Sequence, residues 1–276
     1  MECRSPAVTE YRKRMVQDEQ GAMRIAILNQ KGGTGKTTTT VNLGVGLAQA
    51  GHRVLIIDVD SQGHVAISLG VDGDKTLYHI LVEGAPLAQS VIAARPNLDI
   101  LVGNETLASA EIFLARKNDD RDKALRKTLI DEKGYDFILL DCGPSLSLLN
   151  MNALTFADFL IVPVSCDFLS LIGVKQVMKT LKNVNQVLLH PISILGILPT
   201  FYDMRNNISD ESIKTLQGYF HDKVLPPIRV NTRLKEAPRH QQSIFEYAPD
   251  SRGASDYERL VKWVVEQQQK RLQAVG

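Results

Sequence analysis

A glycine-rich segment, Lys31-Gly32-Gly33-Thr34-Gly35-Lys36-Thr37-Thr38, joins an apolar run at residues 25–28 to a helical pattern at residues 39–50. Glycines allow successive backbone N–H groups to converge on an anion, and the helix that follows points its positive N-terminal end at the same oxygens. The order of strand, glycine-rich loop and helix therefore predicts a phosphate-binding loop.

The side chains of this segment have separate expected roles in binding ATP and Mg²⁺. The pattern G-x-x-x-x-G-K-[ST] places Lys36 beside the β- and γ-phosphates and the Thr37 hydroxyl in the shell of the Mg²⁺ ion. The other positions of the segment predicted to contact the nucleotide are Gly32, Gly33, Thr34, Gly35 and Thr38. The segment departs from the pattern at its start, where Gln30 replaces the first glycine and an additional lysine, Lys31, follows.

Two further apolar runs end in carboxylates. The run that begins at residue 53 ends in Asp58 and Asp60, and the run at 137–140 ends in Asp141. Continuous apolar runs are typical of parallel strands buried on both faces, and ligands bind open α/β sheets at the carboxyl ends of such strands. Mg²⁺ prefers oxygen ligands and keeps most of its waters, so Asp141 is expected to hold the ion, usually through a water. For Asp58, a cap at the end of its strand and a direct contact with the metal are equally open.

Composition excludes some classes of protein. The chain has 276 residues, 44% of them apolar, and a net charge of +1, so binding to nucleic acid or to an anionic membrane would need a local patch. The three cysteines lack the spacing of a metal site and are expected to be reduced thiols in the cytoplasm. No apolar run approaches the roughly 20 residues of a membrane span.

The domain organisation follows from the same patterns. Residues 1–22 are mixed and polar without an apolar period, which predicts a flexible tail, although a basic arm at residues 12–14 for DNA or a partner is the alternative. Residues 23–272 are expected to form a single α/β domain, a doubly wound and mostly parallel sheet flanked by helices. The expected strands lie at 25–28, 53–59, 98–102, 136–140, 159–164 and 193–198. The expected helices lie at 39–50, 76–81, 86–93, 107–117, 120–132, 169–189 and 256–272.

The lysine at the front of the loop resembles that of the deviant Walker A ATPases, a family of P-loop NTPases that includes the ParA/Soj partition proteins, MinD and the nitrogenase iron protein. This resemblance implies that Lys31 contacts the nucleotide of the partner subunit across a face-to-face homodimer. Lys31 is therefore expected to point outward, without a strong role in its own subunit. The family's Asp-x-Asp-Pro-Gln-Gly motif implies that Asp60 orients the attacking water, although Ser61 replaces the usual proline.

Three later stretches resemble the partition proteins in particular. Residues 141–146 are similar to Asp-Cys-Pro-Pro-Ser-Leu, with Gly143 in place of the first proline. Residues 200–205 resemble a stretch near the base of the nucleotide, which implies a nucleotide contact at Asp203. Residues 228–238 are similar to Ile-Pro-Arg-Asn-Val-Arg-Leu-Ser-Glu-Ala-Pro, which implies a contact at Asn231. The arginine that normally follows the proline has moved forward to Arg229, so its usual contact cannot be transferred.

A group of basic residues in this last stretch is a candidate DNA surface. Its members are Arg229, Arg233, Lys235 and Arg239. They would neutralise phosphates without reading bases, although the acids between them are equally compatible with a solvated face. The resemblance favours DNA, because the family binds double-stranded DNA non-specifically as an ATP-bound dimer, with an arginine at the position of Arg233.

The resemblance as a whole implies an ATP-dependent DNA-segregation enzyme. We expect weak, Mg²⁺-dependent ATP hydrolysis coupled to dimerisation, a nucleoid-associated location in the cytoplasm, and a ParB-like centromere-binding partner that stimulates hydrolysis. The alternatives are a positioning ATPase that acts on a membrane surface, as MinD does, or on a protein cargo, and a metabolic or redox relative. Membrane binding is disfavoured, because an apolar stripe on a terminal helix is more often packed on its own domain.

Overall fold

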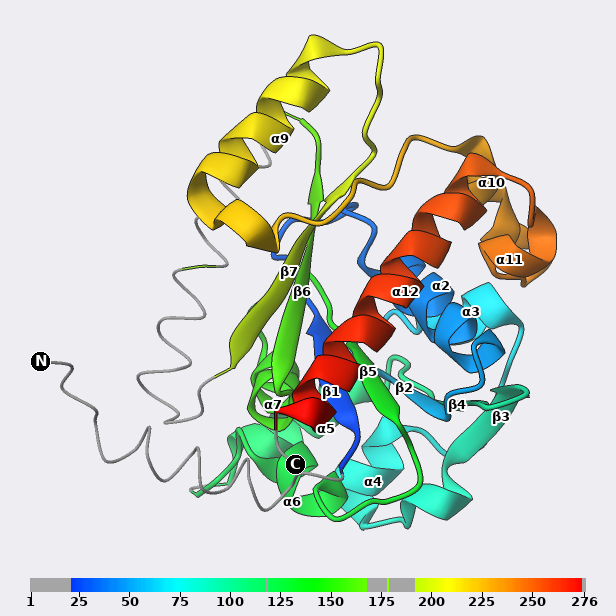
Figure 1. The fold of residues 1–276 in the computed structure, drawn as a ribbon. Coiled ribbons are helices and arrows are strands. Elements are labelled where there is room, and N and C mark those ends of the chain that lie inside the picture. The colour runs from blue at the N-terminus through cyan, green and yellow to red at the C-terminus, as the bar shows by residue number, and fades with distance from the viewer. Residues whose placement is uncertain (1–20, 118, 168–177, 179–191, 275–276) are drawn as a thin grey trace, which may run out of the picture.

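A seven-stranded sheet runs through the computed structural model, which describes residues 21–117, 119–167, 178 and 192–274 (Figure 1). From edge to edge, the strands are β3 (Val91–Arg95), β4 (Leu98–Leu101), β2 (Val54–Asp58), β5 (Phe137–Asp141), β1 (Met23–Ile27), β6 (Phe159–Ser165) and β7 (Ser193–Thr200). All neighbouring pairs are parallel except β3 with β4. This arrangement confirms the predicted doubly wound sheet.

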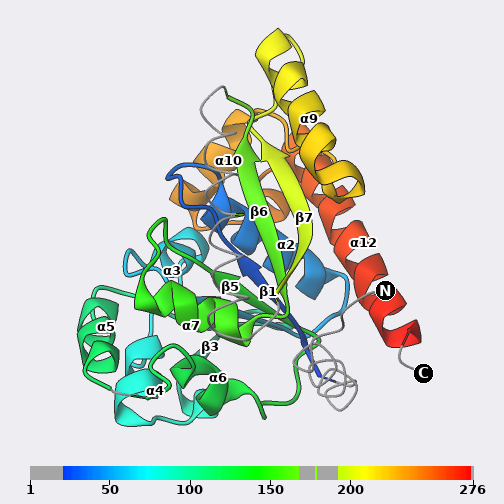
Figure 2. The same cartoon turned by 90° about the vertical axis from the view of Figure 1, so that its left-hand side faces the viewer.

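Each face of the sheet is covered by its own group of helices. On one face, Ala26 and Leu55 pack with α4 (Leu77–Glu83), α5 (Leu107–Ala115), α6 (Ala124–Leu129) and α7 (Leu148–Phe156). On the other, Ile25 and Ile56 pack with α2 (Lys36–Gln49), α3 (His64–Leu69), α11 (Ile244–Tyr247) and α12 (Arg252–Gln273). Figure 2 shows α12 on the opposite side of the sheet from α5 and α7. Because side chains alternate along a strand, burial on both faces explains the continuous apolar runs.

The terminal helix α12 belongs to the core. Its apolar stripe, which includes Leu260, Val261 and Val264, is buried in the cluster that it shares with α2. The two helices approach closely at Gly46, where an added Cβ would lie 2.5 Å from the Val261 side chain. Among the helices of the described residues, none has the length and apolar character needed to cross a membrane.

Some predicted elements differ in the structure. The helix expected at 86–93 is wrong: a short 3₁₀ turn, Leu87–Gln89, leads into strand β3, where Ile92 pairs with Ile100 of β4. Pairing across the chain decided this segment, in agreement with the β-branched Val91 and Ile92. The helix expected at 120–132 is confined to Ala124–Leu129, and the one expected at 169–189 falls outside the described residues except for Met178.

The sequence patterns also missed a helix on the outer side of β7. Helix α9 (Asn207–Phe220) follows Asn206, whose side chain accepts a hydrogen bond from the Ile208 N–H and so caps its N-terminus. An asparagine before an amphipathic stretch was the available signal. Two short elements, α10 (Thr232–Glu236) and a 3₁₀ turn at Ala237–His240, then lead to α11 and α12.

Candidate functional site

The loop between β1 and α2 has the backbone conformation that a phosphate cradle needs. Gly33 and Gly35 have φ values of 71° and 86°, a left-handed region that side chains with a Cβ avoid. Gly35 is the N-cap of the 14-residue helix α2 and provides no side-chain cap, so the first N–H groups of the helix remain available to an anion. The loop is anchored from β7, because the Thr200 hydroxyl donates to the Thr34 carbonyl at 2.9 Å.

Lys36 is a largely desolvated cation at the start of α2. Its side chain is buried, and its ammonium group donates to the carbonyl of Lys31 at 3.2 Å, across the mouth of the loop. Burial lowers the pKa of Lys36, while the negative charges of Asp141 and Asp60 oppose this effect. The ammonium group therefore lies between the loop and the carboxylates, the location expected for a group that binds phosphate oxygens.

Asp141 ends β5 and is held by two hydroxyls of α2. Thr37 donates to one carboxylate oxygen and Thr40 to the other, both at 2.7 Å. The sequence motif predicts Thr37 but not Thr40, although a residue three positions later on a helix lies on the same face. Burial raises the pKa of Asp141 to about 6, while the two threonine hydrogen bonds and Lys36 act in the opposite direction.

Asp58 ends β2, beside Asp141 in the strand register. Its carboxylate is fully buried and accepts the backbone N–H groups of Asp60, at 3.0 Å, and Val65, at 3.1 Å. These bonds anchor both ends of the 60–65 loop, so the strand-end cap is the role that the contacts support. Burial, and then the negative charge of Asp141, raise the pKa of Asp58 well above its usual value.

Asp60 is the third acid near the phosphate loop, after Asp141 and Asp58. One of its oxygens accepts the Gln62 N–H at 3.1 Å, and its charge acts on both Lys36 and Asp141. The carboxyl group faces Gly143, where an added Cβ would lie 3.3 Å from it. The glycine that replaces the family's proline at this position therefore leaves room beside Asp60.

Asp141 and the Thr37 hydroxyl beside it offer the oxygen ligands that Mg²⁺ prefers, and Mg²⁺ needs few protein ligands because it keeps several waters. No group of three or more acidic, histidine or cysteine side chains in the described part of the chain is arranged to hold a metal by itself. Burial, and to a lesser extent the negative charge of a neighbouring carboxylate, raises the pKa values of Asp58 and Asp141, and a divalent cation beside them would lower both pKa values. The residues that would hold it are Asp141 and Thr37, with Thr40 keeping the carboxylate in place.

Lys31 has a partner in its own chain that the sequence does not predict. Its ammonium group contacts both carboxylate oxygens of Asp167 at 2.8 Å, and Ser165 donates to the same carboxylate at 2.6 Å. The sequence could not show this pair, since Asp167 follows β6, 136 positions later. In the single chain, Lys31 is therefore held by a partly exposed ion pair, and its contact with the nucleotide of a partner subunit stays a prediction.

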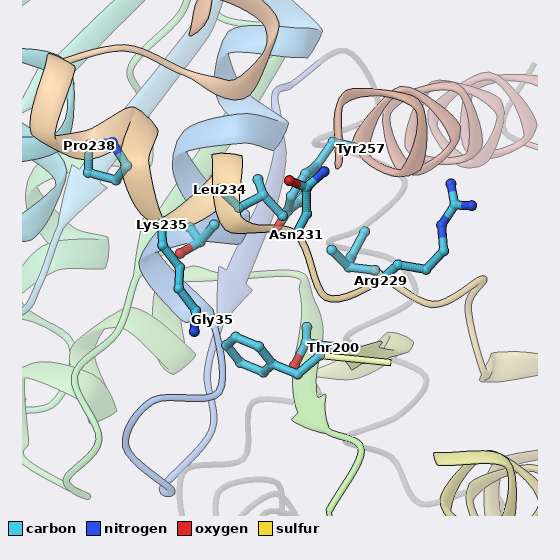
Figure 3. Close-up of a pocket in the computed structure, with 11 residues that line it drawn as sticks. Gly35, Thr200, Arg229, Asn231, Leu234, Lys235, Pro238 and Tyr257 are labelled. Atoms are coloured by element: carbon cyan, nitrogen blue, oxygen red, sulfur yellow. The ribbon is translucent and has the colours of Figure 1, made fainter. Parts of the chain in front are cut away.

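A cavity of about 330 Å³ opens next to the start of α2 (Figure 3). Its walls are mostly apolar and come from four separated parts of the chain. The lining residues are Gly35, Thr38, Thr200, Phe201, Ile228, Arg229, Asn231, Leu234, Lys235, Pro238 and Tyr257. A largely apolar cavity next to a phosphate loop suits the flat ring of a nucleotide base.

The two residues expected to contact the nucleotide in the C-terminal quarter lie in different places. Asn231 lines the cavity and caps α10, because its side-chain oxygen accepts the Arg233 N–H at 2.9 Å. Asp203 is not among the lining residues. It forms a 2.9 Å ion pair with Arg205, which lowers the pKa of Asp203 to about 2.

The four candidate DNA contacts also divide into two kinds. Arg233, Lys235 and Arg239 are exposed on α10 and the turn after it, and Arg233 pairs with Glu236 at 2.9 Å. Arg229 is instead bound to the buried carboxylate of Asp256, with a shortest contact of 2.6 Å. The guanidinium group of Arg229 is therefore committed to an interaction inside the domain.

Comparison with known families and proteins places this geometry among ATPases. A family model described as an AAA domain matches residues 22–194. The chain is 43% identical, over 246 residues, to the sporulation initiation inhibitor protein Soj of Bacillus subtilis, covering 87% of this chain and 97% of Soj. It is 38% identical, over 255 residues, to the chromosome partitioning protein ParA of Caulobacter vibrioides, covering 90% and 95% of the two chains.

Solved structures agree on the fold and on the ligands. Cobyrinic acid a,c-diamide synthase from Mycobacterium smegmatis, solved with an ATP analogue and magnesium, has a TM-score of 0.77 at 30% identity, covering 90% of this chain and 96% of its own. The septum site-determining protein MinD from Pyrococcus horikoshii, solved with Mg-ADP, has a TM-score of 0.74 at 26% identity, covering 91% and 98%. The cofactors expected from the sequence, ATP and Mg²⁺, agree with these bound ligands.

Proposed function

This chain belongs to the Soj/ParA family of chromosome-partitioning ATPases, and from that premise we propose that it is a DNA-segregation ATPase whose ATP-bound homodimer binds double-stranded DNA without sequence preference. The observation that carries the proposal is the position of α10. One side of this helix lines the cavity next to the phosphate loop, through Leu234, and Arg233 is exposed on the same helix. Nucleotide and DNA would thus be bound by neighbouring parts of one short element.

ATP would bind along the line from the loop to the cavity. The N–H groups of the loop and of the first turn of α2 would hold the phosphates, Lys36 would contact the β- and γ-phosphates, and the base would enter the cavity. When bound, Mg²⁺ supplies positive charge to the phosphate oxygens. Asp60 would accept a hydrogen bond from the attacking water and orient it, which is consistent with slow hydrolysis.

For the dimer to form in this way, the ammonium group of Lys31 would have to exchange one anionic partner for another. To reach the phosphates bound by the other subunit, its ammonium group must leave Asp167, a half-exposed pair that costs little to break. ATP would compensate for the loss by offering a more highly charged anion. The dimer would then be a state whose population depends on bound ATP.

The DNA contacts would come from Arg233, Lys235 and Arg239, each of which is exposed. Such contacts neutralise phosphates, so binding would be sequence-independent and sensitive to salt. A ParB-like centromere-binding partner would stimulate hydrolysis and release the dimer, which would otherwise be associated with the nucleoid in the cytoplasm. Arg229 is not included in this surface, because Asp256 binds it.

The test is retention of the full-length chain on non-specific duplex DNA at low salt, with ATP and Mg²⁺ or with ADP and Mg²⁺. The same nucleotides are tested in parallel with anionic phospholipid vesicles. We expect ATP-dependent retention on DNA that disappears as salt rises, and none on vesicles. Retention on vesicles alone would favour the alternative of a membrane-surface ATPase, and retention on neither would contradict DNA binding.

A further inference from the structure

One wall of the cavity depends on the segment that leads into α10. Residues 228–230 continue the edge of the sheet: the Ile228 N–H donates to Pro199 at 2.8 Å and the Val230 N–H to Tyr202 at 2.9 Å. The segment then turns into α10, whose residues Asn231 and Leu234 line the cavity. Whatever fixes residues 228–230 therefore fixes this wall.

An ion pair between Arg229 and the buried carboxylate of Asp256 fixes them to α12. The Asp256 carboxylate has no exposed surface and accepts both the backbone N–H of Arg229, at 2.9 Å, and its guanidinium group, at 2.6 Å from Nη2 and 3.0 Å from Nε. One carboxylate thus binds the main chain and the side chain of a residue 27 positions away. An ion pair in which one carboxylate is buried and accepts several hydrogen bonds restricts geometry more than an ion pair on the surface.

The same turns of α12 form the adjoining wall. Tyr257, next to Asp256, lines the cavity, and its hydroxyl lies 3.3 Å from the Thr39 hydroxyl on α2. Gly253, one turn earlier, packs so closely on α10 that an added Cβ would lie 3.0 Å from the Asn231 amide nitrogen and 3.1 Å from Leu234. The ion pair therefore lies where the two walls of the cavity meet.

The guanidinium group does not itself point into the space that the base would fill. Figure 3 shows the Arg229 side chain directed away from Gly35, toward the red helix α12. Nor does the pair include any residue of the phosphate loop, whose backbone is anchored separately through Thr200 and Thr34. The ion pair between Arg229 and Asp256 is therefore expected to influence only the part of the site that surrounds the base.

We propose that Arg229 and Asp256 are positioning residues that hold α10 against α12 and thereby set the affinity of the cavity for the base of ATP. The proposal rests on the assignment of ATP to this site and adds the residues that control binding of one part of it. It also gives a reason for an arginine at position 229 instead of the proline usual in the family. Proline would lack the N–H and the guanidinium group that Asp256 binds.

The experiment compares two arginines that contact the same carboxylate. Arg259 also donates to Asp256, but from the next turn of the same helix, so it does not join the two walls. Full-length Arg229→Gln and Arg259→Gln variants are titrated with Mg-ATP, and with Mg-tripolyphosphate, which has phosphates but no base. Thermal melting of each nucleotide-free variant reports any general loss of stability.

For Arg229→Gln we expect the Kd for ATP to rise about tenfold, the equivalent of losing one or two well-formed interactions in the base-binding part, with tripolyphosphate binding unchanged. Arg259→Gln should leave both affinities within about twofold. Unchanged ATP affinity in Arg229→Gln, or an equal loss for ATP and tripolyphosphate, would overturn the proposal. If the unmodified chain binds neither ligand, the proposed function itself fails.

A second variant covers the case in which Arg229→Gln does not fold. Arg229→Lys keeps the charge and the backbone N–H but cannot reproduce the forked contact. We expect a Kd for ATP about threefold higher than that of the unmodified chain, again with no change for tripolyphosphate. An affinity for ATP equal to that of the unmodified chain would contradict the proposal in this variant also.

Discussion

The phosphate-binding and base-binding parts of the site are built in different ways. The phosphate part consists of the loop after β1 and of acids at the ends of two adjacent strands, and its contacts are short and mostly buried. The base part is assembled from residues near positions 35, 200, 231 and 257, which come together only in the folded chain. A site made at strand ends follows from a local motif, whereas a site made by packing depends on pairs such as Arg229 and Asp256.

The strongest test of the phosphate part is removal of the Lys36 ammonium group. Lys36→Ala should lower ATP hydrolysis by about 100-fold or more, because the site loses the cation that opposes the charge of the phosphates and of Asp141. Phosphate release under saturating ATP measures the effect. The control is Lys235→Ala, which changes a lysine of the base part and should retain at least half of the activity. An equal loss in both variants would contradict the separation of the site into a phosphate part and a base part.

The effect of the buried carboxylates of the phosphate part on stability can be tested by varying the pH, with nucleotide-free protein in EDTA. The pKa of Asp141 is about 6 in the folded chain and near 3.8 in the unfolded chain, so the folded state holds the proton more tightly. The stabilisation of the folded state by this proton is fully present below pH 3.8. It is lost as the pH rises through 6, which lowers the free energy of unfolding by up to about 3 kcal/mol. Asp141→Asn should remove much of the fall in stability between pH 5 and 7.5 in thermal melting, and an unchanged fall would contradict the assignment.

Removal of the Asp60 carboxylate should separate hydrolysis from binding. Asp60→Ala is expected to slow phosphate release about 50-fold, because the attacking water loses its acceptor, while ATP binding and the ATP-dependent dimer persist. Sedimentation with ATP measures the dimer. Asp72→Ala, a change to another acid outside the site, is the control, and normal hydrolysis by Asp60→Ala would show that this carboxylate does not position the water.

The smallest expected effect concerns the outer side of the base part. Arg233→Gln should weaken ATP-dependent retention on duplex DNA about three- to tenfold at low salt and reduce its salt dependence, because about one phosphate contact is lost. The matched control is Arg205→Gln, which removes an exposed arginine that pairs with an acid in the same way, with Asp203. Equal losses in the two variants would indicate a general effect of net charge.

The phosphate part was largely predictable because each of its segments carries a short local signal: a glycine-rich loop, or an apolar run that ends in an acid. The sequence predicts the glycines, Lys36, Thr37 and the acids that end β2 and β5 as members of this part. It does not predict Thr40, although Thr40 lies on the same face of α2 as Thr37. Lys31 is the exception: its position in the loop was recognisable, but its ion pair with Asp167 depends on β6 lying beside β1.

The base part was predictable only as a set of family-like stretches. Asn231 lines the cavity and Asp203 does not, although both were expected there from similar motifs. Arg229 and Arg233 lie four residues apart in one basic segment, yet Arg229 is paired with the buried carboxylate of Asp256 and Arg233 is exposed on α10. Composition and spacing do not distinguish them, because the distinction depends on which side of the segment α12 covers.

The sequence by itself determined the alternation of strands and helices, the conformation of the phosphate loop and the nature of its ligands. These properties depend on interactions within a few residues: the φ angles open to glycine, the burial of continuous apolar runs and the dipole at the start of a helix. Only the tertiary structure decided the partner of Lys31, the cavity next to the phosphate loop and the pairing of Arg229 with Asp256. Each of these depends on contacts between segments far apart in the chain, where packing and desolvation, more than residue type, select the partner.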